Sequence, residues 1–181
     1  MRLIENFLSP SEASDWLTDF VDPNRMDWQR ESFQIFGRSV QAPRQIAWFG
    51  DAGLNYRYTG IDHEAVGWPT KLAALKSRIE VQAEQRFNFL LLNRYNDGSD
   101  HMGWHRDDEQ GCLGSIASLS IGATRRFSID VTRDNHRTSR ETLELGSGSL
   151  LVFDGRQRHC LRATKKPCEL RVNLTFRLIA P

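Results

Sequence analysis

The sequence is poor in cysteine and has no long hydrophobic run. Its three cysteines, Cys112, Cys160 and Cys168, are odd in number and have no paired spacing, which favours reduced thiols over a disulfide framework. The first ten residues contain only short apolar pieces, interrupted by Glu5 and Asn6, so we expect neither a signal peptide nor a membrane span. These absences favour a cytoplasmic protein, or a nuclear one in a eukaryote, with no membrane partner.

Linkers, repeats and low-complexity segments are also missing. No stretch rich in Pro, Gly or Ser divides the 181 residues, and 39% of the residues are hydrophobic. A chain of this length and composition can bury one substantial core. We therefore expect a single domain over residues 1–181, present as a monomer.

The chain has almost no excess of charge. Its net charge is +1, which taken alone argues against a nucleic-acid-binding protein. The distribution is uneven, because residues 1–120 carry 12 basic and 17 acidic side chains, whereas residues 121–181 carry 12 basic and 6 acidic ones. Such asymmetry can concentrate a basic surface. Around His159 the basic residues are Arg156, Arg158, Arg162, Lys165 and Lys166. They predict a surface for a phosphate backbone or, alternatively, a solvated loop.

Hydrophobic periodicity predicts two helices followed by many strands. Ser9-Pro10-Ser11-Glu12 is a capping box with proline at the first helical position, and it opens a helix through Phe20. Residues 69–86 place apolar side chains at helical spacing. Strands are expected over 87–92, 115–121, 125–131, 141–145, 149–154 and 170–178. This order predicts an α+β protein, mostly β, with a double sheet and N-terminal helices packed on one side.

Two histidines and an aspartate have the composition of a metal site. His105 and Asp107 are two residues apart, so on an extended chain their side chains point to the same side. A distant His159 would complete the two-histidine, one-carboxylate set of non-haem Fe(II) oxygenases, which leaves open positions for substrate and oxygen. Two alternatives stay open here: a solvated polar turn, because His-X-Asp is common, and a zinc hydrolase centre.

The polar face of the last predicted strand suits a dicarboxylate. Over 170–178 apolar residues alternate with Arg171, Asn173, Thr175 and Arg177, and no acid is among them. Because arginine binds carboxylates bidentately, this face predicts a site for 2-oxoglutarate. Six residues of strand separate the two arginine Cα atoms by roughly 20 Å, so the sheet must curve or one arginine must act in support. A zinc hydrolase would leave these side chains without a task. Iron, a 2-oxoacid and O2 together oxidise unactivated C–H bonds.

The combined motifs resemble a known family. They occur in the order Asn93-X-Tyr95, His105-X-Asp107, His159 and Arg171-X-Asn173-X-X-X-Arg177. From about Pro43 to Arg177 this pattern resembles the AlkB group of 2-oxoglutarate-dependent nucleic-acid dealkylases. The segments 43–44, 50–54, 56–60, 105–109 and 171–177 are most similar to the homologues that prefer duplex DNA.

The resemblance implies a fold and an activity. The fold would be a double-stranded β-helix, or jelly roll, in which residues 1–70 contribute nucleotide-recognition elements. The activity would be oxidative dealkylation of N1-methyladenine and N3-methylcytosine in duplex and single-stranded DNA, with formaldehyde, succinate and CO2 as products. An Fe(II)- and 2-oxoglutarate-dependent hydroxylase acting on RNA, protein or a small molecule is the alternative.

The resemblance also assigns roles to individual residues. It implies that Fe(II) is held by His105, Asp107 and His159. It implies a 2-oxoglutarate pocket of Asn93, Tyr95, Arg171, Asn173, Thr175 and Arg177. The flipped base would lie under Tyr56, Tyr58 and Thr59 and beside Asp108 and Glu109. Both methylated bases are cationic at neutral pH, so aromatic faces and carboxylates favour them over undamaged bases. Without the resemblance, the two tyrosines would be interpreted as strand residues packing on a neighbour.

A hairpin tip is the predicted contact with duplex DNA. Ile35-Phe36-Gly37-Arg38 is an apolar pair before a turn, so Phe36 belongs either to a core or to a wedge that fills the gap left by a flipped base. Arg38 and Arg44 would then hold phosphates or the orphaned strand, and Lys165 and Lys166 would extend this contact. Trp104 departs from the similar sequences, which tend to be polar at this position.

Overall fold

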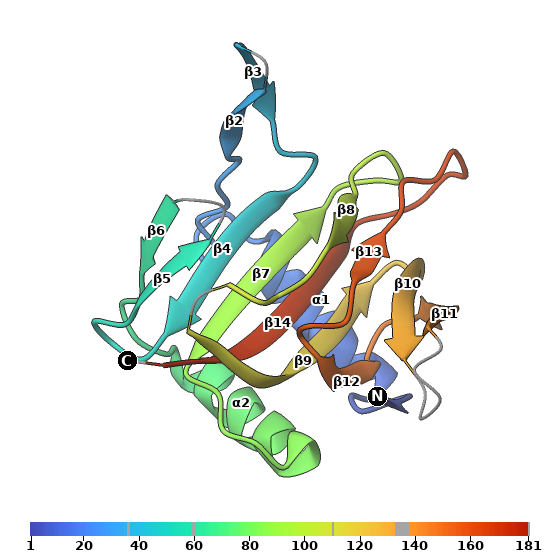
Figure 1. Cartoon of the computed structure of the whole chain (residues 1–181). Helices are drawn as coiled ribbons and strands as arrows, with labels where there is room; N and C mark the ends of the chain where they lie inside the picture. The colour runs from blue at the N-terminus through green and yellow to red at the C-terminus, as the bar shows by residue number, and fades with distance from the viewer. Residues whose placement is uncertain (36, 59–60, 110, 133–137, 181) are drawn as a thin grey trace.

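Two antiparallel sheets form the body of the protein (Figure 1). The computed structural model describes the chain except residues 36, 59–60, 110, 133–137 and 181, and it leaves the side chains of 33–35, 56–58 and 61–63 undescribed as well. The major sheet has the order β1 (Arg2–Ile4), β12 (Leu150–Asp154), β9 (Cys112–Gly122), β14 (Arg171–Ile179), β7 (Phe89–Tyr95) and β4 (Gln45–Gly50). The minor sheet has the order β11 (Thr138–Leu145), β10 (Arg125–Thr132), β13 (His159–Leu161) and β8 (Met102–His105).

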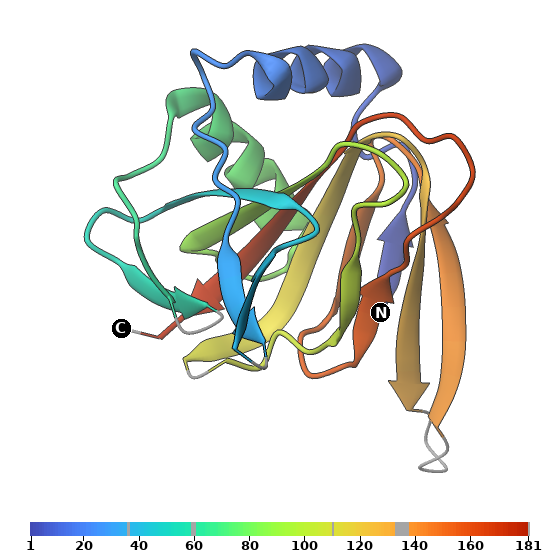
Figure 2. The same cartoon turned by 90° about the horizontal axis from the view of Figure 1, so that it is seen from above.

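The major sheet lies between two helices and the minor sheet (Figure 2). The helices are α1 (Pro10–Val21) and α2 (Thr70–Ala83). Their buried residues share a core with the rear of the major sheet, where Val172, Leu174 and Phe176 are fully buried. This arrangement confirms the mostly β jelly roll with helices on one side. Neither described helix is long and apolar enough to cross a membrane.

Local signals explain why the predicted helices form. Ser9 Oγ accepts a hydrogen bond from the Glu12 amide (3.2 Å), and the Glu12 carboxylate accepts one from the Ser9 amide (2.9 Å), so the capping box is confirmed. These bonds, together with Arg78, lower the pKa of Glu12 to about 2. Helix α2 is shorter than predicted, because the chain turns into a left-handed conformation at Glu84 (φ 54°).

Two hairpins extend from the body near one edge of the major sheet (Figure 1). The first consists of β2 (Ser32–Ile35) and β3 (Arg38–Gln41), with Ile35 opposite Arg38. The second consists of β5 (Asn55–Tyr58) and β6 (Ile61–Glu64). The sequence predicts that these two hairpins carry the contacts with a base and with duplex DNA.

Candidate metal and cosubstrate site

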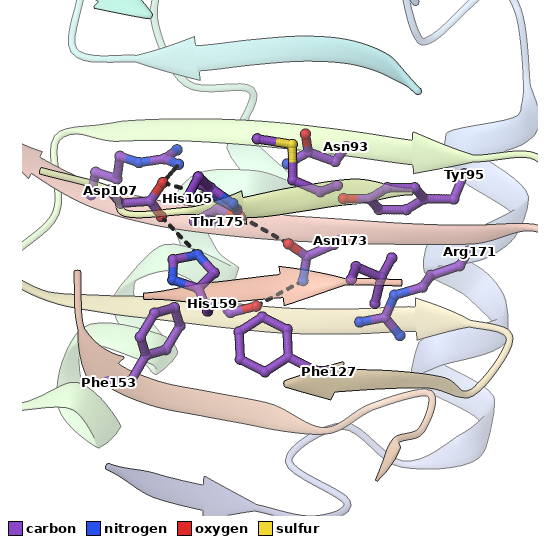
Figure 3. A pocket seen from close by; sticks show the side chains of 14 residues that line it. Asn93, Tyr95, His105, Asp107, Phe127, Phe153, His159, Arg171, Asn173 and Thr175 are labelled. Atoms are coloured by element: carbon purple, nitrogen blue, oxygen red, sulfur yellow. Dashed lines mark hydrogen bonds and ion pairs between the residues drawn. The ribbon is translucent and has the colours of Figure 1, made fainter. Parts of the chain in front are cut away.

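Strand pairing brings the three predicted metal ligands together. His105 ends β8 and is the direct partner of His159, which begins β13. Asp107 follows two residues after His105, and its amide donates to Gly155 O (2.9 Å). A Cβ at Gly155 would lie 2.6 Å from Asp107 O, so glycine permits this close approach. One ligand atom from each of the three residues lies within 4.8 Å of the others (Figure 3).

Hydrogen bonds orient both imidazoles toward a common point. Nδ1 of His105 lies 2.8 Å from Gly103 O, and Nδ1 of His159 lies 2.8 Å from Gln157 O. Each Nδ1 therefore carries the proton, and each Nε2 keeps a lone pair for a metal. Burial lowers the pKa of His159 to about 4, so this ring is neutral at neutral pH. The donor set of two imidazole nitrogens and one carboxylate fits Fe(II).

Arg177 holds the aspartate of this set in its charged form. Its Nη2 lies 2.9 Å from Asp107 Oδ1, and both side chains are almost completely buried. Burial opposes ionisation of Asp107, but the neighbouring charge of Arg177 favours it, and the pKa of Asp107 is lowered. The other carboxylate oxygen, Oδ2, faces His159 (3.9 Å). Arg177 thus supports a metal ligand, in addition to lining the cavity.

Arg171 places a buried cation at the opposite end of the same cavity (Figure 3). Nη1 donates to Leu145 O (3.0 Å), and Nη2 donates to Ser120 Oγ (2.7 Å). Burial lowers the pKa of Arg171 to about 10, so it stays protonated at neutral pH. Among the described residues no carboxylate pairs with it, and its Nε has no hydrogen-bond partner. A buried cation without a counter-charge is costly, so this end of the cavity fits the distal carboxylate of 2-oxoglutarate.

Polar side chains between the two ends are fixed by the sheet. Asn173 Nδ2 donates to Ser118 Oγ (2.8 Å), and Asn173 Oδ1 accepts from Thr175 Oγ1 (2.8 Å). Burial raises the pKa of Tyr95, so its phenol is neutral and can donate a hydrogen bond. Apolar residues close the cavity, and they are Met102, Phe127, Phe153 and Leu161. All six residues predicted for the 2-oxoglutarate pocket line this cavity.

Arg44 is buried, although the sequence analysis predicts that it contacts DNA. The sequence predicts a contact with phosphate or with the orphaned strand, but only 3% of Arg44 is exposed. Its Nε donates to Asn93 Oδ1 (2.8 Å). The reason is that Asn93, in the buried strand β7, needs a donor for its side-chain oxygen. Arg44 therefore supports the cosubstrate side of the cavity.

The other predicted DNA contacts lie on or near the surface where they are described. Arg38, Asp108, Lys165 and Lys166 are exposed, and Glu109 is half-buried. The backbone of Tyr56 and Tyr58 belongs to β5, but their side chains are outside the description. Phe36 and Thr59 lie outside the described residues altogether.

Several residues that shape the site were not predicted from the sequence. Ser118 and Ser120 anchor Asn173 and Arg171, and the only signal was two polar positions inside an apolar strand. Arg125 is 3% exposed and donates to Asp97 O (3.0 Å), Asp100 O (2.9 Å) and Arg162 O (2.7 Å). It thereby ties the loop before β8 to the end of β13, the two strands that carry the histidine ligands.

Comparisons with known proteins agree with this geometry. The family model described as 2OG-Fe(II) oxygenase superfamily matches residues 1–177. The chain is 42% identical to DNA oxidative demethylase ALKBH2 of Bos taurus, over 82% of this chain and 57% of that protein. It is 34% identical to alpha-ketoglutarate-dependent dioxygenase alkB homolog 3 of Homo sapiens, over 99% of this chain and 66% of that protein. The chain thus spans less than two thirds of the length of these relatives.

A solved structure supports the fold. The structure of OsALKBH1 superimposes with a TM-score of 0.59 and 19% sequence identity, over 97% of this chain and 96% of that chain. At this identity the likeness concerns the fold, which is the two-sheet architecture described above. Together with the family match and the histidine–aspartate–histidine set, the comparisons show that the chain belongs to the AlkB family of the 2OG-Fe(II) oxygenase superfamily.

Proposed function

We propose that this protein is an Fe(II)- and 2-oxoglutarate-dependent dioxygenase that demethylates N1-methyladenine and N3-methylcytosine in DNA. The observation that carries the proposal is one cavity with a metal-ligand set at one end and the buried cation of Arg171 at the other. The names of the ALKBH2 relatives, which are DNA oxidative demethylases, supply the substrate class.

The side chains of the metal and cosubstrate site have separate roles in this reaction. His105, Asp107 and His159 hold the iron, and Arg171 binds the distal carboxylate of 2-oxoglutarate. When bound, iron, 2-oxoglutarate and O2 supply the oxidation of the methyl group, with succinate and CO2 as the other products. The aromatic walls Phe127 and Phe153 pack against His159, at ring-centroid distances of 5.4 and 4.9 Å, and exclude water from the ligand set. The hydroxylated methyl group then leaves the base as formaldehyde.

Substrate selection is assigned to the residues that follow Asp107 in the sequence and to the two hairpins. A methylated base carries a positive charge at neutral pH, so Asp108, Glu109 and the β5–β6 hairpin with Tyr56 and Tyr58 favour it over an undamaged base. Phe36 lies between β2 and β3 in the sequence, and its proposed role is to fill the gap that the flipped base leaves in a duplex. Both hairpins lie toward the same edge of the major sheet, which supports a common substrate (Figure 1).

The proposal includes a cellular compartment and an oligomeric state for the enzyme. The three cysteines of the described chain are free thiols, which supports a reducing compartment, the cytoplasm or, in a eukaryote, the nucleus. We further propose that the enzyme acts as a monomer on both duplex and single-stranded DNA.

The test uses defined oligonucleotides that carry one methylated base. The purified protein is incubated with iron, 2-oxoglutarate and O2, and mass spectrometry measures the loss of one CH2 unit per lesion. Omission of iron or of 2-oxoglutarate should abolish this loss. If no methylated oligonucleotide is altered while 2-oxoglutarate is still consumed with an RNA, a protein or a small molecule, the proposed substrate class is wrong and the hydroxylase alternative replaces it.

A further inference from the structure

Trp104 lies on the outer face of the minor sheet, opposite the cavity. Successive side chains of a strand point to opposite faces, and His105 points into the cavity (Figure 3). The half-buried Trp104 ring is approached by three arginines from other strands or their ends. The guanidinium carbons of Arg140, Arg158 and Arg162 lie 4.2, 5.4 and 6.0 Å from the ring centroid.

Most of the positive charge in this cluster has no acidic partner. Arg140 pairs with Asp130, at 3.0 Å between Nε and Oδ1. Within the described ranges no carboxylate forms an ion pair with Arg158 or Arg162, and both side chains are exposed. An aromatic face stabilises a nearby cation by about 0.5–1 kcal/mol at exposed sites, which does not remove the repulsion among three cations. A bound anion would supply the missing charge, and the arginine fork matches phosphate oxygens.

The basic surface continues beyond a single phosphate. Arg162 lines one hollow together with Arg125, Arg126, Lys166 and one acid, Glu144. Arg158 lines another hollow together with Arg106, Arg156 and two acids, Asp130 and Asp154, so basic residues outnumber acidic ones in both hollows. Cations in two separate hollows suit a chain of phosphates better than one free anion, because each phosphate of a polyanion can be neutralised in turn. Arg158 directly precedes the metal ligand His159, and Trp104 directly precedes His105, so the surface is the reverse side of the strands that hold the reactive centre.

We infer that Trp104, Arg140, Arg158 and Arg162, here called the Trp104 cluster, bind the sugar–phosphate backbone of the nucleic acid whose methylated base enters the cavity. The inference rests on the proposed function and adds a substrate-binding surface to it. Arg158 and Arg162 make the phosphate contacts. Trp104 is a positioning residue, since its ring limits the conformations of long side chains that would otherwise lose entropy on binding.

Salt dependence of DNA binding tests the Trp104 cluster directly. Fluorescence anisotropy under anaerobic conditions measures the affinity of the whole protein for a duplex with one N3-methylcytosine and for the same unmodified duplex, over a range of salt concentrations. Each phosphate contact contributes about 0.9 to the slope of log K against log salt. We expect Arg158→Gln and Arg162→Gln each to reduce this slope by about 0.9 for both duplexes. At about 0.1 M salt this corresponds to about 8-fold weaker binding.

Three further variants separate a specific role from a general loss of charge. Arg78→Gln removes an exposed arginine of helix α2, on the other side of the major sheet (Figure 2), whose partner is Glu12 (2.8 Å), and it should leave the slope almost unchanged. Trp104→Leu should weaken binding of both duplexes, whereas Trp104→Phe, which keeps a ring, should restore most of it. Thermal melting of each variant checks that the fold is retained.

The possible outcomes distinguish the cluster from the proposed function. If the wild type demethylates DNA but both arginine variants keep its slope, the Trp104 cluster does not bind the backbone, and the proposed function stands. An equal loss of slope in Arg78→Gln would also overturn the cluster, because the effect would then be one of net charge. If the wild type neither binds nor demethylates these duplexes, the proposed function fails and the inference fails with it.

Discussion

Replacement of Arg171 by leucine removes the cation at one end of the cavity. In the folded protein this guanidinium has no carboxylate partner among the described residues and is 1% exposed. A bound 2-oxoglutarate carboxylate would therefore interact with it inside the protein, away from water. Removal of one member of such a buried, hydrogen-bonded charge pair costs about 2–5 kcal/mol. The apparent requirement for 2-oxoglutarate should consequently rise by about 30- to 4000-fold in Arg171→Leu.

The assay compares two substrates in the same variant. Initial rates of demethylation give KM for 2-oxoglutarate and KM for methylated DNA, and only the first should rise strongly. Arg125→Leu is the matched control, since Arg125 is also buried and donates to backbone carbonyls but does not line the cavity. The control should lower the melting temperature without a selective effect on 2-oxoglutarate. An equal rise of both KM values in Arg171→Leu would refute the assignment of Arg171 to the cosubstrate.

Three further predictions concern the metal ligand, the hairpin and a buried acid. Asp107→Ala should abolish 2-oxoglutarate consumption and iron binding while the circular dichroism spectrum is retained; iron-dependent turnover in this variant would remove Asp107 from the ligand set. Phe36→Ala should lower the ratio of activity on methylated duplex to activity on the same single strand by about 5- to 150-fold, from about 1–3 kcal/mol of lost stacking, whereas an unchanged ratio in a stably folded variant would exclude the wedge. Burial opposes ionisation of Glu80, but the Phe87 amide (2.8 Å) and Lys76 (2.9 Å) outweigh it, so the pKa of Glu80 lies below 4.5. The ionised Glu80 carboxylate therefore stabilises the fold above pH 4.5, and this stabilisation is lost as the pH falls through the folded-state pKa. Denaturant titrations should show a smaller loss of stability on acidification in Glu80→Gln than in the wild type.

Elements with an unbroken local signal were predictable from the sequence. Helix α1 has a complete capping box, and β14 has an unbroken alternation whose apolar face packs under the helices. The predicted metal ligands could also be identified from the sequence, because the residue types His, Asp and His occur in the order and spacing of a known ligand set. Strands β8 and β13 were not predicted as such, because they are only four and three residues long and their polar residues serve the site.

Long-range partners explain the remaining differences. The burial of Arg44 depends on Asn93, and the support of Asp107 by Arg177 depends on the meeting of β14 with the loop after β8. An arginine is usually exposed, so its sequence position alone favours a surface role. Only the three-dimensional arrangement shows which arginines of this chain lie inside and which remain available to a ligand.

The direct pairing of His105 with His159 has a consequence for the mechanical integrity of the minor sheet. Strand β8 is the outermost strand of that sheet, and its register with β13 is interrupted between His159 and Leu161. Iron bound by residues of both strands would link them next to this interruption. We expect release of the metal to loosen this outermost strand, and an exposed strand edge favours aggregation. The metal would then stabilise the minor sheet in addition to its role in oxidation, and hydrogen exchange of the β8 amides should follow iron occupancy.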